Sequence, residues 1–207
     1  MLESRIVRIA IATAITAIGM AASKAHAQES VEQPAAAPVT SNGWEFSMTS
    51  GKMLPTGAQR SAIQRAGLSA AQLSYVMHAR YGLMATLGWA RSRDVATEGE
   101  PRLDVFTYDV GAEIRTDALA LGATTTLRPF AGVGAGGRTY NYRKLDVDAT
   151  HNMAAYGSVG GELGVKRVRV RIEARDYVTG FRPLSGVGAS ATRNDMSVMA
   201  GVRIVSR

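Results

Sequence analysis

Cysteine is absent from this chain of 207 residues. Without thiols the protein has no disulfide framework, no cysteine-ligated metal site and no cysteine that could carry a lipid after an export signal. Only three histidines occur, and no glycine cluster separates a strand from a helix start, as a phosphate-binding loop requires. We therefore expect no cofactor, no bound metal, no catalytic residues and no nucleic-acid partner.

Long apolar runs are also missing beyond the first 27 residues. A helix that crosses a bilayer needs roughly 20 consecutive apolar residues, so a helical membrane protein is disfavoured. The strands of a membrane β-barrel are short and only half apolar, so this absence leaves such a barrel possible.

The first 27 residues have the layout of a secretory signal peptide. Arg5 and Arg8 precede an apolar run from Ile9 to Ala22, and Ala25-His26-Ala27 fits a small-x-small cleavage site. The alternative is a helical anchor, but about 14 apolar residues are too few to span a bilayer. We predict cleavage before Gln28, export across the inner membrane of a Gram-negative bacterium, and residence in its outer membrane.

Residues 28–43 are rich in Gln, Ala, Pro, Ser and Thr and read as a flexible lead-in to a single domain at residues 44–207. The chain carries a formal net charge of +7 at pH 7. A basic surface can attract anionic lipid headgroups, although a simply solvated surface has the same composition.

The stretch from Arg167 to Arg175 alternates charged and aliphatic residues without a slip. Alternation at period two places all charges on one face of a strand and all aliphatic side chains on the other. The charged face either meets water on a soluble barrel or lines the interior of a membrane barrel. In the second case Val168, Val170, Ile172 and Ala174 meet lipid.

Eight segments alternate in this way, each about ten residues long, as in strands of outer-membrane barrels. They are Trp44–Thr49, Leu73–Arg80, Gly82–Arg91, Val105–Arg115, Leu127–Tyr140, Met153–Val165, Arg167–Tyr177 and Asp195–Val205. Long connections alternate with short ones, and the first runs from Ser50 to Gln72, where the spacing of Ile63, Ala66, Ala70 and Leu73 allows a helical turn. The sequence predicts an all-β fold, an eight-stranded antiparallel up-and-down transmembrane β-barrel.

The charged faces of these segments predict a lumen filled by ion pairs instead of an open pore. An eight-stranded barrel is just wide enough for side chains to fill, and unpaired charges inside would be costly. The expected lumen charge network comprises Asp109, Glu113, Arg115, Arg128, Arg138, Glu162, Arg169, Arg171, Glu173, Arg175 and Arg203. Gly132, Gly134 and Gly136 share this face and would leave room for large inward side chains such as Arg171 and Tyr156.

The stretch Arg128-Pro129-Phe130-Ala131-Gly132-Val133-Gly134-Ala135-Gly136 and the strand around Arg171, Glu173, Arg175 and Tyr177 resemble those of small outer-membrane β-barrels of the OmpA transmembrane-domain and OmpX type. The resemblance covers about residues 43–207. It implies a monomer, surrounded by outer-membrane lipid and lipopolysaccharide and inserted by the barrel-assembly machinery. Trp44, Phe46, Trp89, Phe106 and Tyr108 would form the aromatic girdles of such a barrel.

The specific function is less determined than the fold. The main hypothesis is a structural outer-membrane barrel whose surface loops mediate envelope integrity or surface interaction. Cationic residues expected in those loops are candidates for contacts with lipopolysaccharide phosphates: Lys52, Arg60, Arg65, Arg143 and Lys144.

Two other hypotheses remain. One is a lipid A-modifying enzyme, for which His78 in the lumen beside Ser74, or His151 in a loop near Asp146 and Asp148, would have to serve as the base. The other is a soluble periplasmic barrel that binds a ligand in an apolar cavity; inward-facing arginines and glutamates would be incompatible with it.

Overall fold

The computed structural model describes residues 42–165, 167–181, 183–184 and 191–206. The expected signal peptide, residues 1–27, and nearly all of the expected lead-in, residues 28–43, lie outside this range. Within it, no helix combines the length and the apolar character that crossing a bilayer demands. The helix that the structure does contain, η2 (Gly57–Ser61), is a single short 3-10 turn.

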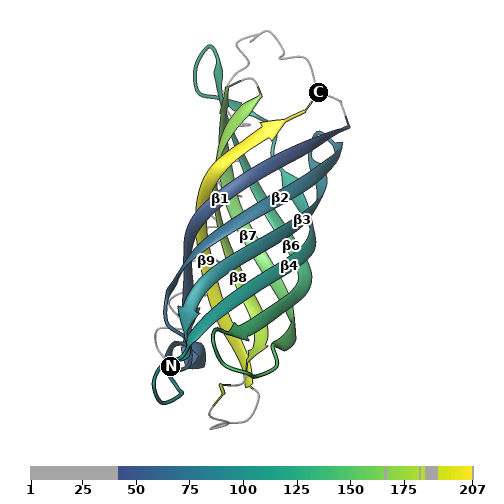
Figure 1. Ribbon diagram of the computed structural model, residues 1–207. Helices are drawn as coiled ribbons and strands as arrows, with labels where there is room; N and C mark the ends of the chain where they lie inside the picture. Colours follow the sequence, from purple (N-terminus) through teal and green to yellow (C-terminus); the bar gives the residue numbers. More distant parts are fainter. Residues whose placement is uncertain (1–41, 166, 182, 185–190, 207) are drawn as a thin grey trace. The chain divides into compact units, whose positions relative to one another are not determined.

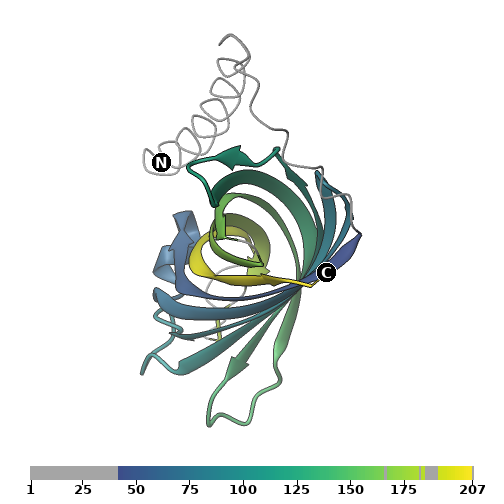
Figure 2. The ribbon, with the colours of Figure 1, turned by 90° about the horizontal axis from the view of Figure 1, so that it is seen from above.

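Eight long strands form one closed antiparallel barrel, which confirms the predicted fold class (Figures 1 and 2). Each strand pairs with its neighbours in the sequence, and pairing of the first strand with the last, and of β4 with β6, completes the ring. The strands are β1 (Gly43–Thr56), β2 (Ala66–His78), β3 (Tyr81–Arg93), β4 (Arg102–Arg115), β6 (Thr125–Tyr142), β7 (Thr150–Val165), β8 (Val168–Phe181) and β9 (Ala191–Val205), while β5 (Leu119–Ala120) is a two-residue strand beside β6.

The first two strands are longer than the alternation predicted. β1 continues to Thr56 and β2 begins at Ala66, so most of the stretch predicted as a connection is paired strand, and the helical spacing of Ala66, Ala70 and Leu73 is coincidental. The alternation of apolar and polar residues is weak in these parts of β1 and β2, because small residues occupy both the inward and the outward positions, as Gly51 and Gly67 do. The chain leaves the barrel only over residues 57–65, which include η2.

The connections fall into two sets, one at each end of the barrel. At the upper end in Figure 1, where β1 begins and β9 ends, two of the connections are as short as residues 79–80 and 166–167. At the lower end the connections are residues 57–65, 94–101, 143–149 and 182–190. The predicted alternation holds, except that the upper connection at residues 116–124, which carries β5, is as long as the lower ones.

Inward and outward positions alternate along each strand as the charge pattern indicated. In β8, Arg171, Glu173 and Arg175 are buried, whereas Val168 and Ile172 are exposed on the outside. The exception is the end of β2, where the register shifts between Val76 and His78. This bulge turns His78 outward opposite Tyr81, so the prediction of a lumen-facing histidine is wrong.

Glycines of β6 and of its neighbour β4 make room for the inward side chain of Tyr156. The sequence suggested such space in β6, because its glycines alternate on the same face as the charged residues. A Cβ atom on Gly134 would lie 2.6 Å from the Tyr156 hydroxyl, and one on Gly111 would also collide with that hydroxyl. The Tyr156 ring then packs inside the barrel against Tyr177, with their ring centroids 5.2 Å apart. The small residues therefore set the space into which a large side chain fits.

Candidate functional site

The outside of the barrel is an apolar surface to which all eight long strands contribute. Its exposed members include Trp44, Phe46, Met48, Leu73, Leu83, Leu87, Phe106, Val110, Val133, Met153, Ile172, Val202 and Ile204. Aromatic side chains stand toward both ends: the Trp44 ring packs at a tilt against Tyr75 near the upper end, and Trp89 stands opposite Phe106 in the lower half. An apolar surface that includes residues of every long strand is unfavourable in water. This surface is therefore suited to contact with lipid.

The upper half of the lumen holds a network of charged side chains centred on Arg171. This guanidinium contacts carboxylates from three strands: Glu113 at 2.5 Å, Glu162 at 2.8 Å and Glu173 at 3.0 Å. The ring of Phe130 lies beneath it, with its centroid 3.6 Å from the guanidinium carbon. A planar fork of donors can serve several carboxylates at once, which a lysine ammonium does less well.

Two further arginines tie the same carboxylates together toward the upper end. Arg203 contacts Glu162 at 2.6 Å, Glu45 at 3.0 Å and Glu113 at 3.5 Å. Arg115 contacts Glu45 at 2.7 Å and Glu113 at 2.6 Å. Each glutamate is thus shared, and the charges of β1, β4, β7, β8 and β9 form one connected network.

The network extends downward through Arg175, Arg138 and their partners. Arg175 contacts Glu173 at 2.6 Å and Asp109 at 3.5 Å, and the Tyr177 hydroxyl donates to Asp109 at 2.6 Å. Arg138 pairs with Asp195 and lies over the Tyr177 ring at 4.1 Å. Asp195 was not among the expected lumen residues, although it stands in phase with Ser197 and Arg203 on β9.

The remaining expected lumen residues lie at the upper rim of the network. Arg169 is partly exposed and approaches Glu162 at 3.3 Å and Glu45 at 3.6 Å. Arg128 stands opposite Glu162 in the register but, in the part of the chain that the structure describes, forms no ion pair. The structure thus brings ten of the eleven expected lumen charges into ion pairs with one another or with Glu45 and Asp195.

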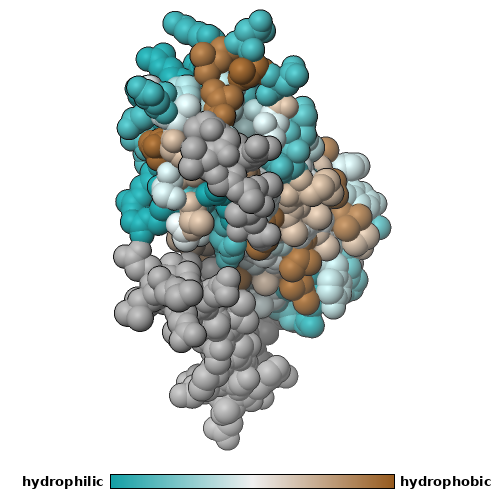
Figure 3. Space-filling model, turned by 90° about the horizontal axis from the view of Figure 1, so that it is seen from below, coloured by the Kyte–Doolittle hydropathy of each residue, from teal (hydrophilic) through white to brown (hydrophobic). Residues whose placement is uncertain are grey.

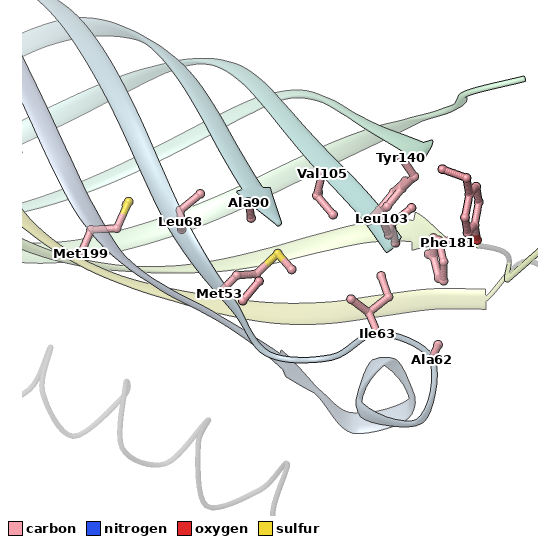
Figure 4. Packing of buried hydrophobic residues seen from close by; sticks show 12 residues of the cluster. Met53, Ala62, Ile63, Leu68, Ala90, Leu103, Val105, Tyr140, Phe181 and Met199 are labelled. Atoms are coloured by element: carbon pink, nitrogen blue, oxygen red, sulfur yellow. The ribbon is translucent and has the colours of Figure 1, made fainter. Parts of the chain in front are cut away.

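The lower half of the lumen contains a cluster of packed apolar side chains, which the sequence did not indicate. We call this cluster the apolar plug: Met53, Ala62, Ile63, Ala66, Leu68, Ala90, Leu103, Val105, Tyr140, Tyr142, Phe181 and Met199 (Figure 4). The rings of Tyr140 and Phe181 pack at a tilt, with their centroids 4.6 Å apart, and Ile63 enters from the connection after η2. Between the plug and the charge network lies a cavity of only about 10 Å³, which is room for about one water molecule.

A buried carboxylate holds the lower connections over the plug. Asp94 accepts hydrogen bonds from the Tyr142 hydroxyl at 2.6 Å, the Thr97 hydroxyl at 2.8 Å and two backbone amides, of Ala96 at 3.0 Å and Leu184 at 3.1 Å. These donors come from three different connections or strand ends. Asp94 therefore links the connection at residues 94–101, Leu184 and the end of β6 at this mouth of the barrel.

The two histidines that the enzyme hypothesis needs are both on the outside of the barrel. His78 faces outward at the upper end, and His151 lies in β7 instead of a loop, with its Nδ1 2.8 Å from the Thr139 hydroxyl. Over the described ranges, no group of three histidines or carboxylates is placed to hold a metal ion.

The five expected lipopolysaccharide contacts are spread over the lower end. Lys52 belongs to β1 and not to a loop, and faces outward; Arg60 lies in η2 and Arg65 just before β2, both exposed. Arg143 forms an ion pair with Asp104 at 2.5 Å, and Lys144 is exposed with a positive φ of 63°. Lys52 was assigned to a loop because the strand pattern fades beyond Thr49.

Comparisons with known proteins find likeness in structure alone. The chain matches Neisserial surface protein A with a TM-score of 0.59 at 11% identity, over 78% of this chain and 96% of that one. The chain has the fold of the small outer-membrane β-barrels. The N-terminal barrel of Pseudomonas aeruginosa OprF gives a TM-score of 0.47 at 11% identity, over 80% of this chain and 100% of that one. No family model matches the sequence, and no curated protein matches it.

Proposed function

We propose that the protein is a structural component of the outer membrane of a Gram-negative bacterium, exported by its N-terminal signal peptide. The observation that carries this proposal is the contrast between the two faces of one barrel. The outer face is apolar along every long strand, whereas the lumen is closed by paired charges above and by the apolar plug below. Such a molecule is stable in lipid and offers no path for solutes.

The lower connections would then face the cell exterior and carry the interactions of the protein. Figure 3 shows hydrophilic residues gathered on this end, with hydrophobic groups among them and along the flank. The connection at residues 143–149 exposes Leu145 and Val147 beside Lys144 and two aspartates. These loops would mediate envelope integrity or contact with other surfaces, and the similar Neisserial protein is itself named a surface protein.

We further propose that the barrel is a monomer, inserted by the barrel-assembly machinery, and that it is not an enzyme. Among the described residues neither histidine stands beside a serine or carboxylate in the arrangement that activates a nucleophile. Along the described strands, buried arginines and carboxylates occupy the part of the lumen where a soluble ligand-binding barrel would need an apolar cavity.

The test combines location, fold and conductance of the full-length protein. Membrane fractionation should place the mature chain in the outer membrane, and unheated samples should migrate differently from heated ones on gels, as folded barrels do. Purified protein in planar lipid bilayers should show no stable channels. A soluble periplasmic protein without a heat-dependent shift would contradict the membrane assignment, and steady large conductance would contradict the closed lumen.

Unchanged lipid A mass spectra in His78→Ala and His151→Ala strains would support the absence of catalysis.

A further inference from the structure

Arginine side chains gather on the outer wall of the barrel at its lower end, outside the lumen network. Arg91 and Arg93 point outward from β3, since the intervening Ser92 is buried. Arg93 stands directly opposite Arg102 of β4 in the register, and the Arg143 amide donates to the Arg102 carbonyl at 3.0 Å. We call Arg91, Arg93, Arg102 and Arg143 the arginine cluster.

The cluster has more positive charge than its surroundings neutralise. Asp104 is paired with Arg143 and also accepts from the Trp89 indole at 3.3 Å, while Arg91 lies over the Trp89 ring at 4.3 Å. Among the residues that the structure describes, neither Arg93 nor Arg102 forms an ion pair. Like charges directly opposite on neighbouring strands destabilise a sheet, so an anion between them would relieve a standing repulsion.

The arginines surround a depression that could receive such an anion. It has a volume of about 280 Å³, and its walls include the whole arginine cluster together with Gln64, Ser92, Leu103 and Asp104, the carboxylate that is paired with Arg143. Guanidinium groups bind phosphate oxygens through two parallel hydrogen bonds, which is why arginine is frequent at phosphate sites.

An apolar groove lies on the outer wall next to the arginine cluster, toward the start of β3. It has a volume of about 850 Å³ and crosses β9, β1, β2, β3 and β4. Small side chains form its floor, where Ser50 pairs with Ser69 on one side and with Ala200 on the other. Its walls include Leu87, Trp89 and Phe106.

The groove and the arginine cluster adjoin each other on β3, because Arg91 of the cluster lies over the ring of Trp89, which lines the groove. Arg91 follows Trp89 by two residues on the outer face of β3, and Lys52 follows Ser50 in the same way on β1. Two residues of a strand cover about 7 Å, so the cationic groups begin where the groove ends. A polar, cationic end joined to an apolar channel suits an amphiphile that has a phosphorylated head and acyl chains.

We propose that this wall site binds the phosphorylated glycolipid of the outer leaflet, lipid A with its attached sugars, with a phosphate among the arginines and an acyl chain in the groove. The assignment rests on the proposed function, which places the lower end at the cell exterior. A lipid that carries two phosphates and several acyl chains matches both the charge of the cluster and the apolar groove. The site differs from the expected loop contacts, since Arg91, Arg93 and Arg102 stand on strands.

The first experiment measures binding of bisphosphorylated lipid A to the full mature protein in vesicles, with Trp89 emission as the signal in a Trp44→Phe background that removes the other tryptophan. The double variant Arg93→Gln/Arg102→Gln should weaken binding at least tenfold. The double control Arg167→Gln/Arg80→Gln removes the same number of exposed charges at the opposite end and should change binding less than twofold. Equal losses in both would overturn the proposal, because they would show generic charge attraction.

The second experiment separates the two halves of the ligand. Dephosphorylated lipid A and phosphatidylglycerol should each bind at least tenfold more weakly than lipid A; equal binding of either would overturn the site. Ala71→Phe fills the groove and should weaken lipid A binding, whereas Ala155→Phe on the outer face of β7 should not. Dimers formed through this wall in detergent, with loss of dimers in Ala71→Phe, would assign the groove to a second copy and overturn the proposal.

Failure of this inference is distinguishable from failure of the proposed function. If fractionation and heat-dependent mobility place the barrel in the outer membrane while lipid A shows no preference for the wall site, only the inference fails. If the wild-type chain is not in the membrane at all, the proposed function fails first.

Discussion

Arg171 shows how a single residue joins distant parts of the chain. Its guanidinium is completely buried and serves Glu113, Glu162 and Glu173, which come from three different strands. Burying a charge costs several kcal/mol, and only well-placed opposite charges offset that cost. Each partner therefore depends on the others remaining in place.

Replacing Arg171 with methionine should destabilise the barrel by about 3–5 kcal/mol, because it leaves buried carboxylates without their shared counter-ion. The measurement is urea-induced unfolding in lipid vesicles, followed by tryptophan emission. Arg167→Met, at an exposed turn position at the upper end, is the control and should change stability by less than about 0.5 kcal/mol. Similar stability of the two variants would show that the network contributes little.

Asp117 and Arg80 form a pair at the upper turns, outside the strands of the barrel. Two hydrogen bonds from the guanidinium, of 3.0 Å and 2.5 Å, hold the pKa of the Asp117 carboxyl below its usual range. Because the folded pKa is depressed, the small stabilisation from this pair is present above the ordinary aspartate pKa of about 3.9 and is lost as the pH falls through the lower folded value. NMR titration should show this depression, and Arg80→Gln should raise the pKa of Asp117 back toward the ordinary value; an unchanged pKa would exclude the pair in solution.

At the scale of strands, glycine positions decide how closely neighbours approach. Gly51 of β1 and Gly201 of β9 face the lumen where these two strands close the ring, opposite Met199 and Thr49 respectively. A Cβ atom on Gly201 would lie 2.6 Å from the Thr49 Cα, closer than any side chain can be. The seam between the first and last strands thus depends on the absence of side chains at these two positions.

Gly201→Ala should cost about 1–3 kcal/mol, since the added methyl group must push backbone apart. Gly157→Ala on the outer face of β7, where nothing lies within 4 Å of the new methyl group, should be neutral or slightly stabilising. Unfolding in urea compares the two variants with the wild type. A neutral Gly201→Ala would mean that the seam relaxes more readily than its geometry suggests.

At the scale of the whole molecule, two layers of different chemistry fill the lumen, the charge network in the upper half and the apolar plug in the lower half. The upper layer excludes water by paired charges and the lower layer by packed apolar side chains, with a cavity of about 10 Å³ between them. We therefore expect the loss of one layer to leave the barrel closed by the other.

The double variant Tyr140→Ala/Phe181→Ala should remove much of the apolar plug, destabilise the barrel by several kcal/mol and still show no stable conductance in planar bilayers. The charge network would continue to close the lumen. Retained heat-dependent mobility confirms that the variant is folded, and Leu87→Ala on the outer wall provides a control that leaves both layers intact. Steady channels in the folded variant would show that the plug alone closes the wild-type barrel.

Much of this architecture could be predicted from residue patterns. The alternation in β8 indicated which of its side chains face inward, and the phase of Gly134 with the charged positions indicated room for Tyr156. Other parts were hidden. His78 changed face because one inserted residue reverses all later positions in a strand, and the pattern contains no mark of where a bulge falls. Met53 was expected in a connection, so the apolar plug was not foreseen.

The sequence by itself determined the alternation of charged and apolar residues. Except beyond a bulge such as that in β2, this alternation decides which side of a strand faces which surroundings, because successive side chains point to opposite faces. Only the tertiary structure decided which charges meet. Strand register brings Arg171 to Glu113, 58 positions away in the chain, and places Arg93 opposite Arg102 on the outer wall. Register depends on where each strand starts, where it bulges and where the chain turns. These positions must be compatible with closure of the whole ring, which is a property of the tertiary structure.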